Sequence, residues 1–461
     1  MESVDRKTLL RSLPSIDRVL KTPEAGLLKE RWLGRLVDEE VRGLVEELRK
    51  SIQEGNAPGA PPEPAEVARR AGARLERRLA PGVVRCVNAT GVVLHTGLGR
   101  APLPPAASRA LAREAAGYCV VSVDREEGQR VRRESAAARM LCALTGAEAA
   151  TVVNNNAAAT LLALNTLAAG REAILSRGQL VEIGGSFRMP DVFVAAGVKL
   201  REVGTTNRTH LKDYARAVGA ETALLLRVHP SNFRVVGFTH DVGLRELVAL
   251  GRERNIPVMD DLGAGALLSL PPEPEIAESL RLGADLVTCS GDKLIGGPQA
   301  GILLGRETVI DQVRRNPLFR ALRVDKLTLA ALEGTLGLFL RAGGPAEDHP
   351  SLRMLRARPE TIASRARGLL RRIRAAAPGY ITGLRKDASE VGSGSMPGEA
   401  LPTTLVTLER PGESASHLAR RLRLSDPPVY SRIVDDTVCL DPRTLLPGDA
   451  ACLIAVLKEL A

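Results

Sequence analysis

Aromatic side chains are scarce in this sequence, which has one tryptophan, four tyrosines and six phenylalanines among 461 residues. Proteins that bind single-stranded nucleic acids stack bases on aromatic side chains, so the scarcity argues against such a surface. A folded RNA recognised by its backbone and shape fits the composition better. The 64 Lys and Arg residues outnumber the 54 Asp and Glu residues, and the formal charge of +10 suits a polyanionic partner.

Cysteine and histidine are also few, with six of each, and they form neither a Cys-x-x-Cys nor a His-x-x-x-His pair. The dispersed cysteines argue against a zinc ribbon or a disulfide framework, so we expect reduced thiols. The dispersed histidines give a metal site little support, and none is predicted. Demanding chemistry in this chain would therefore use an organic cofactor.

Long apolar runs are missing as well. The longest, residues 157–169, is interrupted by polar residues and is too short to cross a bilayer, so no membrane-spanning helix is predicted. The first residues lack the apolar core and the small-residue cleavage site of a secretory signal. We therefore expect a soluble protein in the cytoplasm.

Three domains are expected, because 461 residues exceed the size at which a single core usually stops growing. Leucines and valines at helical spacing predict an N-terminal helical domain that ends in a linker rich in proline and glycine, together residues 1–64. Residues 65–335 are expected to form a large α/β domain, and residues 336–461 a small C-terminal α+β domain.

The large domain shows short β-branched runs that alternate with helical stretches. Such runs occur at residues 149–153, 224–228, 256–260 and 285–289. The alternation predicts a mostly parallel sheet covered by helices on both faces. Ligands of such sheets bind beyond the carboxyl ends of the strands, so the segments that follow these runs are the candidates for a functional site.

Lys293 follows the last of these runs, in a segment of small residues between Ser290 and Pro298. The small residues leave room for an aromatic ring, and the glycines let the backbone turn closely beside it. A confined lysine loses its proton readily enough to form a Schiff base with a carbonyl cofactor. Taken alone, a lysine after a strand is usually only a solvated residue.

Two other strand ends supply what a pyridoxal 5′-phosphate site needs. One is a polar run at the start of a helix, whose N-terminus attracts phosphate and can also be capped by asparagine: Asn154, Asn155, Asn156 and Ala157. The other is Asp260, which ends a buried run and could pair with the pyridine nitrogen. We favour Asp260 over the adjacent Asp261, which could instead cap the next element.

The order of these parts, a phosphate segment, then an aspartate, then a lysine, resembles the aspartate-aminotransferase-like family of type I pyridoxal-phosphate enzymes. In that family the large domain binds the cofactor, a small C-terminal domain closes on it, and dimers share the active site. The resemblance implies the same fold and a homo-oligomer for this chain.

Longer segments look like those of a narrower family, the bacterial L-seryl-tRNA(Sec) selenium transferases, or selenocysteine synthases. They lie at residues 13–20, 88–96, 180–188, 203–209, 316–326 and 402–404. The resemblance implies conversion of L-seryl-tRNA(Sec) to L-selenocysteinyl-tRNA(Sec) with selenophosphate. The implied route is β-elimination to an aminoacrylyl-tRNA and then addition of selenium, with Lys293 as the base. The resemblance also implies a homodecamer built from dimers and a tRNA-binding N-terminal domain.

Selenophosphate carries concentrated negative charge, so guanidinium groups are expected in its pocket. The candidates are Arg320 and Arg323, three residues apart on a predicted helical turn, and Arg100. Ordinary surface arginines are the alternative interpretation of all three.

The chain departs from this family at residues 128–133, which read Gly-Gln-Arg-Val-Arg-Arg where Gly-Ser-Arg is usual. The departure concerns the substrate rather than the cofactor. One alternative function is therefore a pyridoxal-phosphate lyase that acts on a small amino acid or amino sugar phosphate without tRNA. A second is a catalytically silent tRNA-binding scaffold, against which the intact Lys293 and Asp260 argue.

Overall fold

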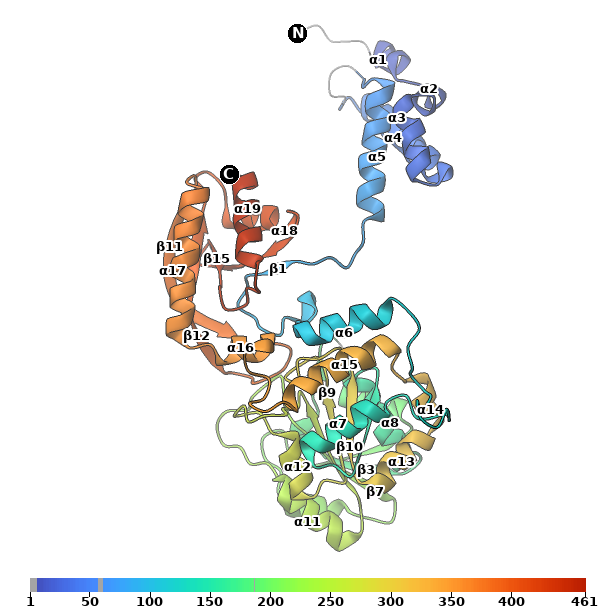
Figure 1. Ribbon diagram of the computed structural model, residues 1–461, viewed down its shortest axis with the longest axis vertical. Helices are drawn as coiled ribbons and strands as arrows, with labels where there is room; N and C mark the ends of the chain where they lie inside the picture. Colours follow the sequence, from blue (N-terminus) through green and yellow to red (C-terminus); the bar gives the residue numbers. More distant parts are fainter. Residues whose placement is uncertain (1–5, 57–60, 186) are drawn as a thin grey trace. The chain divides into compact units, whose positions relative to one another are not determined.

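The computed structural model describes residues 6–56, 61–185 and 187–461. The chain forms two compact units, Met1–Arg85 and Cys86–Ala461 (Figure 1). Within the described ranges, no helix is both long enough and apolar enough to cross a membrane.

The first unit is a small helical bundle. Its helices are α1 (Arg6–Ser12), α2 (Ile16–Leu20), α3 (Pro23–Arg31), α4 (Gly34–Gln53) and α5 (Pro64–Leu79). The apolar faces of α4 and α5 pack on each other around Val41, Val67 and Leu75. The boundary expected at residue 64 is therefore corrected: α5 belongs to this bundle, because its apolar stripe covers α4, and the unit ends at Arg85.

The second unit is built around a seven-stranded sheet. In order across the sheet, its strands are β2 (Ala149–Val153), β10 (Gly301–Gly305), β9 (Leu286–Ser290), β8 (Val258–Gly263), β7 (Thr222–Val228), β3 (Glu172–Ser176) and β6 (Lys199–Val203). All neighbours are parallel except β10, which is antiparallel to both β2 and β9. The predicted mostly parallel sheet is confirmed.

Helices cover both faces of this sheet, as its two apolar cores require. One face carries α7 (Ser135–Thr145), α10 (Leu211–Ala217), α11 (Leu244–Arg254), α12 (Ile276–Leu282) and α15 (Lys326–Phe339). The other carries α8 (Asn156–Ala168), α9 (Met189–Ala195) and α13 (Glu307–Arg315). Successive strand residues alternate between the two cores, so Val258 packs on the first face and Met259 on the second.

Shorter elements border the sheet. They are the 3₁₀ helices η1 (Thr96–Leu98), η2 (Arg177–Gln179) and η3 (Ala346–Asp348), helices α6 (Pro105–Ala115) and α14 (Pro317–Ala321), and the hairpin of β4 (Glu182–Ile183) with β5 (Phe187–Arg188). Helix α6 lies along α15 (Figure 1). The two helices approach closely at Gly334, where a Cβ atom would lie 2.8 Å from the Cα of Ala107.

The small domain is a four-stranded antiparallel sheet with helices. Its elements are α16 (Pro350–Arg356), α17 (Pro359–Ala376), β11 (Ile381–Glu390), β12 (Ala400–Glu409), α18 (Ala415–Arg423), β13 (Val429–Tyr430), β14 (Arg432–Val434), β15 (Thr437–Leu440) and α19 (Asp449–Leu460). The strand order is β11-β12-β15-β14. An α+β arrangement follows, as the sequence predicted.

The domain boundaries within the second unit differ from those expected. Strand β1 (Val87–Asn88) pairs in parallel with β13, and Val92 bridges to Glu390, so this early segment packs with the small domain. Helix α15 runs through the expected break at residue 335 without interruption and ends at Phe339. Apolar residues of the segment, such as Ala89, are buried in the small-domain core.

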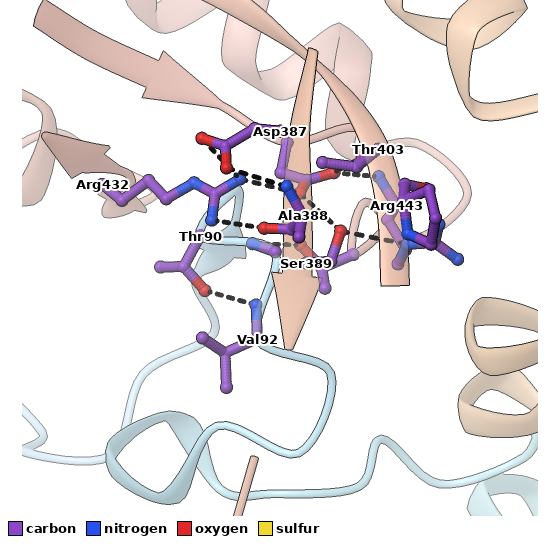
Figure 2. Close-up of polar contacts among 12 residues, drawn as sticks. Thr90, Val92, Asp387, Ala388, Ser389, Thr403, Arg432 and Arg443 are labelled. Atoms are coloured by element: carbon purple, nitrogen blue, oxygen red, sulfur yellow. Dashed lines mark hydrogen bonds and ion pairs between the residues drawn. The ribbon is translucent and has the colours of Figure 1, made fainter. Parts of the chain in front are cut away.

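A buried polar network ties the small domain together (Figure 2). The guanidinium of Arg443, only 1% exposed, donates to Ser389 Oγ over 3.0 Å and to the Pro402 carbonyl over 2.6 Å. Asp441 accepts hydrogen bonds from Ser389 Oγ at 2.7 Å and Thr403 Oγ1 at 2.9 Å. Every one of these groups has a partner, so the network serves the fold.

Candidate active site

Lys293 lies in the turn that follows β9, in a cavity of about 250 Å³ beyond the carboxyl ends of the strands. The residue is 7% exposed. Burial lowers the pKa of its amine, the nearby charge of Arg100 lowers it further, and Asp292 and Asp261 oppose the shift. A lowered pKa makes the neutral, nucleophilic amine more accessible, as a Schiff-base lysine requires.

The polar run expected to receive a phosphate begins helix α8. Asn155 is the N-cap, and its side chain accepts a hydrogen bond from the backbone of Ala158 over 2.8 Å. Asn155, Asn156 and Ala157 all line the lysine cavity, so the N-terminus of α8 opens onto it. Asn154 is exposed and does not line this cavity; its backbone N–H donates to the Leu322 carbonyl.

Asp261 also lines the lysine cavity and is 4% exposed. Its Oδ1 accepts hydrogen bonds from the Asn156 amide at 2.9 Å and the Gly263 backbone at 3.1 Å. Its Oδ2 accepts one from Thr160 Oγ1 at 2.9 Å. These three donors fix the orientation of the carboxylate between β8 and α8.

The preference for Asp260 is corrected by its position. Asp260 is fully buried, with Oδ1 2.9 Å from Arg227 Nη1 and Oδ2 2.7 Å from Ser279 Oγ. Both partners lie on the face of the sheet that α12 covers, away from α8. Adjacent strand residues point to opposite faces, so only one of the two aspartates can face the cavity, and that one is Asp261.

Arg100, a predicted selenophosphate-binding residue, lines the lysine cavity. Its Nη1 donates to Asp292 Oδ2 over 2.8 Å, and the other oxygen of Asp292 accepts from Ser290 Oγ over 2.7 Å. The arginine has a left-handed backbone, with φ of 61°. This ion pair holds a positive charge beside Lys293.

Arg320 and Arg323 do not meet Lys293 within one chain. They line a separate cavity of about 370 Å³, together with Arg132, Arg133 and other residues. Arg133 donates to the Val324 carbonyl over 3.2 Å and so supports the backbone of the pair. The segment that departs from the family pattern therefore borders the predicted anion-binding arginines.

His229 and Ser231 line the lysine cavity but were not among the predicted site residues. His229 follows β7, and its backbone N–H donates to the Asp261 carbonyl over 2.8 Å. Its Nε2 lies 3.5 Å from Glu273 Oε2. Ligands bind beyond the carboxyl ends of parallel strands, and this rule pointed to Asp260 and Asp261 at the end of β8. Strand β7 is the parallel neighbour of β8, so the same rule points to the residues after Val228.

The residues of the lysine cavity fit a planar, phosphate-bearing aldehyde such as pyridoxal 5′-phosphate. A buried amine with a lowered pKa can hold the aldehyde carbon. The N-terminus of α8 offers backbone N–H groups to a phosphate. Asp261 offers an oriented carboxylate to a protonated ring nitrogen.

Comparison with known proteins gives concordant matches along the chain. The model of the L-seryl-tRNA selenium transferase family matches residues 86–446. The L-seryl-tRNA(Sec) selenium transferase of Geobacter sulfurreducens is 47% identical over 98% of this chain and 100% of its own length. That of Moorella thermoacetica is 45% identical over 99% of this chain and 98% of its own length.

Among solved structures, D-glucosaminate-6-phosphate ammonia-lyase is similar, with a TM-score of 0.58 and 21% identity, covering 84% of this chain and 97% of that one. Thermus thermophilus aspartate aminotransferase gives a TM-score of 0.42 at 17% identity, over 87% and 98%. The predicted fold class is confirmed, and the chain belongs to the L-seryl-tRNA selenium transferase family.

Proposed function

We propose that this chain converts L-seryl-tRNA(Sec) to L-selenocysteinyl-tRNA(Sec) with pyridoxal 5′-phosphate as its cofactor. The observation that carries the proposal is the cavity around Lys293, which combines a buried amine, an oriented carboxylate and a helix N-terminus. The similarity to curated relatives over 98% of the chain supports the same substrate.

Each part of the cavity has a role in this proposal. Lys293 would hold the cofactor through its amine and would act as the base that removes the proton from the seryl Cα. When bound, the cofactor would supply an electron sink for the Cα electrons, so that the β-hydroxyl can leave as water. The selenium of selenophosphate can then add at the β-carbon while its bond to phosphorus breaks and phosphate is released. Asp261, in place of Asp260, would pair with the ring nitrogen. Asn155, Asn156 and Ala157 provide the phosphate site, with Asn154 outside it.

Selenophosphate is the proposed selenium donor, and arginines would bind it. Arg100 already lies in the lysine cavity. Arg320 and Arg323 line another cavity, so a second copy of the chain would have to bring its pair to the lysine. The proposal therefore requires a homo-oligomer built from dimers, and a homodecamer is the form that the family resemblance implies.

The helical unit is the proposed tRNA-binding domain. It has an apolar core of its own, which suits an independent recognition module. Because aminoacylated tRNA belongs to the translation machinery, we place the enzyme in the cytoplasm. Bound tRNA should therefore protect residues of this unit from hydrogen exchange.

The alternative functions receive less support. The similarity to the ammonia-lyase at 21% identity concerns the fold alone. A silent scaffold would have no need to keep Lys293 and Asp261 buried and oriented in one cavity. Both alternatives lack the tRNA chemistry named by relatives that match nearly the whole chain.

The direct test is to incubate the cofactor-loaded protein with seryl-tRNA(Sec) and selenophosphate and to identify the esterified amino acid. We expect selenocysteine from the wild type and unchanged serine from Lys293→Ala. The visible absorbance of the bound cofactor, which the same variant should lose, reports loading independently. Unchanged serine from a fully loaded wild type would contradict the proposal.

A further inference from the structure

The ester bond of the substrate restricts where the end of the tRNA can bind. The seryl group is joined directly to the 3′-terminal ribose of an aminoacyl-tRNA. When the seryl amine reaches Lys293, that ribose must occupy a space that opens from the lysine cavity. Two large cavities share a lining residue with it, one through Ser231 and one through His229.

We propose that the 3′-terminal nucleotide of the seryl-tRNA binds in the cavity that shares Ser231, called here the Ser231 cavity. This inference rests on the proposed function and adds a subsite to it. The cavity has a volume of about 520 Å³, within the range of about 300–1,000 Å³ of small-molecule sites. Its lining includes Ser231, Asn232, Asp387, Ser395, Glu399 and Arg432.

Two buried hydroxyls of this cavity are unsatisfied. Ser231 is 0% exposed and Ser395 is 4% exposed. Neither Oγ has a hydrogen-bond partner in the part of the chain that the structure describes. Buried polar groups are almost always hydrogen-bonded, so a pair of orphaned hydroxyls beside a cavity indicates a polar ligand.

Arg432 of β14 adds a guanidinium to the same cavity, and two of its nitrogens make no hydrogen bond within the described residues. Figure 2 shows its guanidinium reaching β11, where Nη1 donates to the Ala388 carbonyl over 2.8 Å. Nη2 lies 3.5 Å from Asp441 Oδ2 and 3.7 Å from Asp387 Oδ2. Within the described residues, neither Nη2 nor Nε makes a hydrogen bond. The guanidinium is thus held in place with N–H groups left for a ligand.

The lining of the Ser231 cavity contains both a guanidinium and carboxylates, which suits a nucleotide better than a free phosphate. Asp387 and Glu399 accept hydrogen bonds, and they would repel an isolated anion. A ribonucleotide presents both kinds of partner. Its hydroxyls and base amino group donate to carboxylates, and its phosphate and ribose oxygens accept from Arg432.

The loop at residues 392–398 brings these groups against the large domain. Its Gly394 has φ of +60°, and a Cβ atom there would lie 3.0 Å from the Cβ of Asn232. Ser231 Oγ lies 3.5 Å from the same point. The close approach requires glycine and places the loop of Ser395 directly beside the lysine cavity.

The cavity that shares His229, about 370 Å³, has less need of a ligand. The side-chain amide of Gln179 donates to both oxygens of Asp241 and accepts from the Val228 backbone over 3.0 Å. Asn207 donates to the Phe238 carbonyl over 2.7 Å. These two side chains already have partners within the protein. Glu273 Oε2, which also belongs to this lining, makes no hydrogen bond within the described residues, but it lies 3.5 Å from His229 Nε2.

The test compares the affinity of the full-length, cofactor-loaded protein for uncharged tRNA(Sec) and for the same tRNA without its terminal adenosine. For the wild type, we expect removal of the adenosine to weaken binding about tenfold, as the loss of one or two charge-assisted hydrogen bonds implies. In Ser395→Ala and in Arg432→Gln, the same removal should weaken binding less than about threefold.

Ser351→Ala is the matched control. Ser351 of α16 is also fully buried with an unpartnered hydroxyl, yet it lines neither cavity. This variant should keep the wild-type difference between the two tRNAs. Removing an unsatisfied hydroxyl leaves no partner stranded, so both serine variants should unfold at or above the wild-type temperature.

A wild-type difference retained in both Ser395→Ala and Arg432→Gln would overturn the inference. So would a photo-crosslink from a 3′-terminal azidoadenosine that maps to residues 205–209 or 233–241 rather than to 387–400. The binding assay involves no selenium transfer, so its result tests the nucleotide subsite independently of the proposed enzymatic activity. A protein that does not bind tRNA(Sec) at all contradicts the proposed function instead.

Discussion

The side-chain amide of Asn156 donates to Oδ1 of Asp261 over 2.9 Å, joining the first turn of α8 to the end of β8. Thr160, one turn further along α8, donates to the other oxygen. The helix whose N-terminus is the proposed phosphate site therefore also orients the carboxylate of Asp261. A shift of α8 would move both proposed contacts to the cofactor together.

Asp261→Asn should lower turnover by at least about a hundredfold, because an amide cannot keep the ring nitrogen protonated. The cofactor should still bind, since Lys293 and α8 are intact. Single-turnover assays with seryl-tRNA(Sec), together with the cofactor absorbance, separate the two effects. An unchanged rate would show that the ring nitrogen has another partner.

Asp260→Asn is the companion variant and should behave in the opposite way. It removes the charge that pairs with Arg227 inside the sheet, so we expect the free energy of unfolding to fall by about 3 kcal/mol. Turnover per folded molecule should stay within about threefold of the wild-type value. Loss of a group that takes part in proton transfer would lower it much further, by about a hundredfold or more. Urea unfolding and active-site titration measure the two quantities. A loss of turnover like that of Asp261→Asn would restore Asp260 as the ring partner.

Lys293→Met should stabilise the cofactor-free protein at neutral pH. Burial lowers the pKa of Lys293 from its ordinary value of 10.5, so the unfolded chain binds more protons between the native pKa and 10.5. Above pH 10.5 the lysine is neutral in both states and its titration does not reduce the free energy of unfolding. As the pH falls from 10.5 to the native pKa, protonation increasingly favours the unfolded chain, and the wild type loses stability. The advantage of Lys293→Met should therefore shrink as pH rises.

Thermal unfolding across the alkaline range measures this difference. The exposed Lys199, paired with Glu221 at 3.4 Å, gives the control variant Lys199→Met, whose difference from the wild type should vary little with pH. An advantage of Lys293→Met that stays constant through pH 10.5 would contradict the lowered pKa of Lys293.

Arg320→Ala and Arg323→Ala should each raise the KM for selenophosphate about tenfold or more, as expected for a lost charge-assisted contact. The KM for seryl-tRNA(Sec) should change little. Arg315→Ser is the control, because Arg315 is exposed and does not line this cavity. Equal effects on both substrates would indicate that the pair supports the fold.

Arg443→Leu should destabilise the small domain by about 3 kcal/mol or more, because it strands buried acceptors and the Asp441 charge. Arg365→Leu on the exposed side of α17 should cost less than about 0.5 kcal/mol. Chemical unfolding of the two variants makes the comparison. Similar midpoints for both would show that the network of Arg443 contributes nothing net.

The sequence predicted the parts of the fold that carry apolar runs. Strands β2, β7, β8 and β9 lie close to where those runs placed them. Strands β3 and β6 were not predicted, because the apolar run of β3 is only three residues long, 173–175, and charged residues interrupt the pattern of β6. The antiparallel direction of β10 depends on pairing with both neighbours, which no local pattern encodes.

The site was predictable in its residue types and less so in its geometry. Lys293 and the α8 N-terminus follow from the rule that sites form beyond strand ends. Choosing Asp261 over Asp260 required knowing which face of β8 meets α8. The separation of Arg320 and Arg323 from Lys293 is a property of tertiary structure, invisible to spacing along the chain.

The pairing of β1 with β13 has a consequence for biosynthesis. Hydrogen bonds such as that from Thr444 to the Asn88 carbonyl join residues 356 positions apart. During translation, the segment around Val87 must wait for nearly the whole second unit before it finds its partner strand. The bundle of α1–α5, complete long before, can fold first on the ribosome, whereas the small domain closes last.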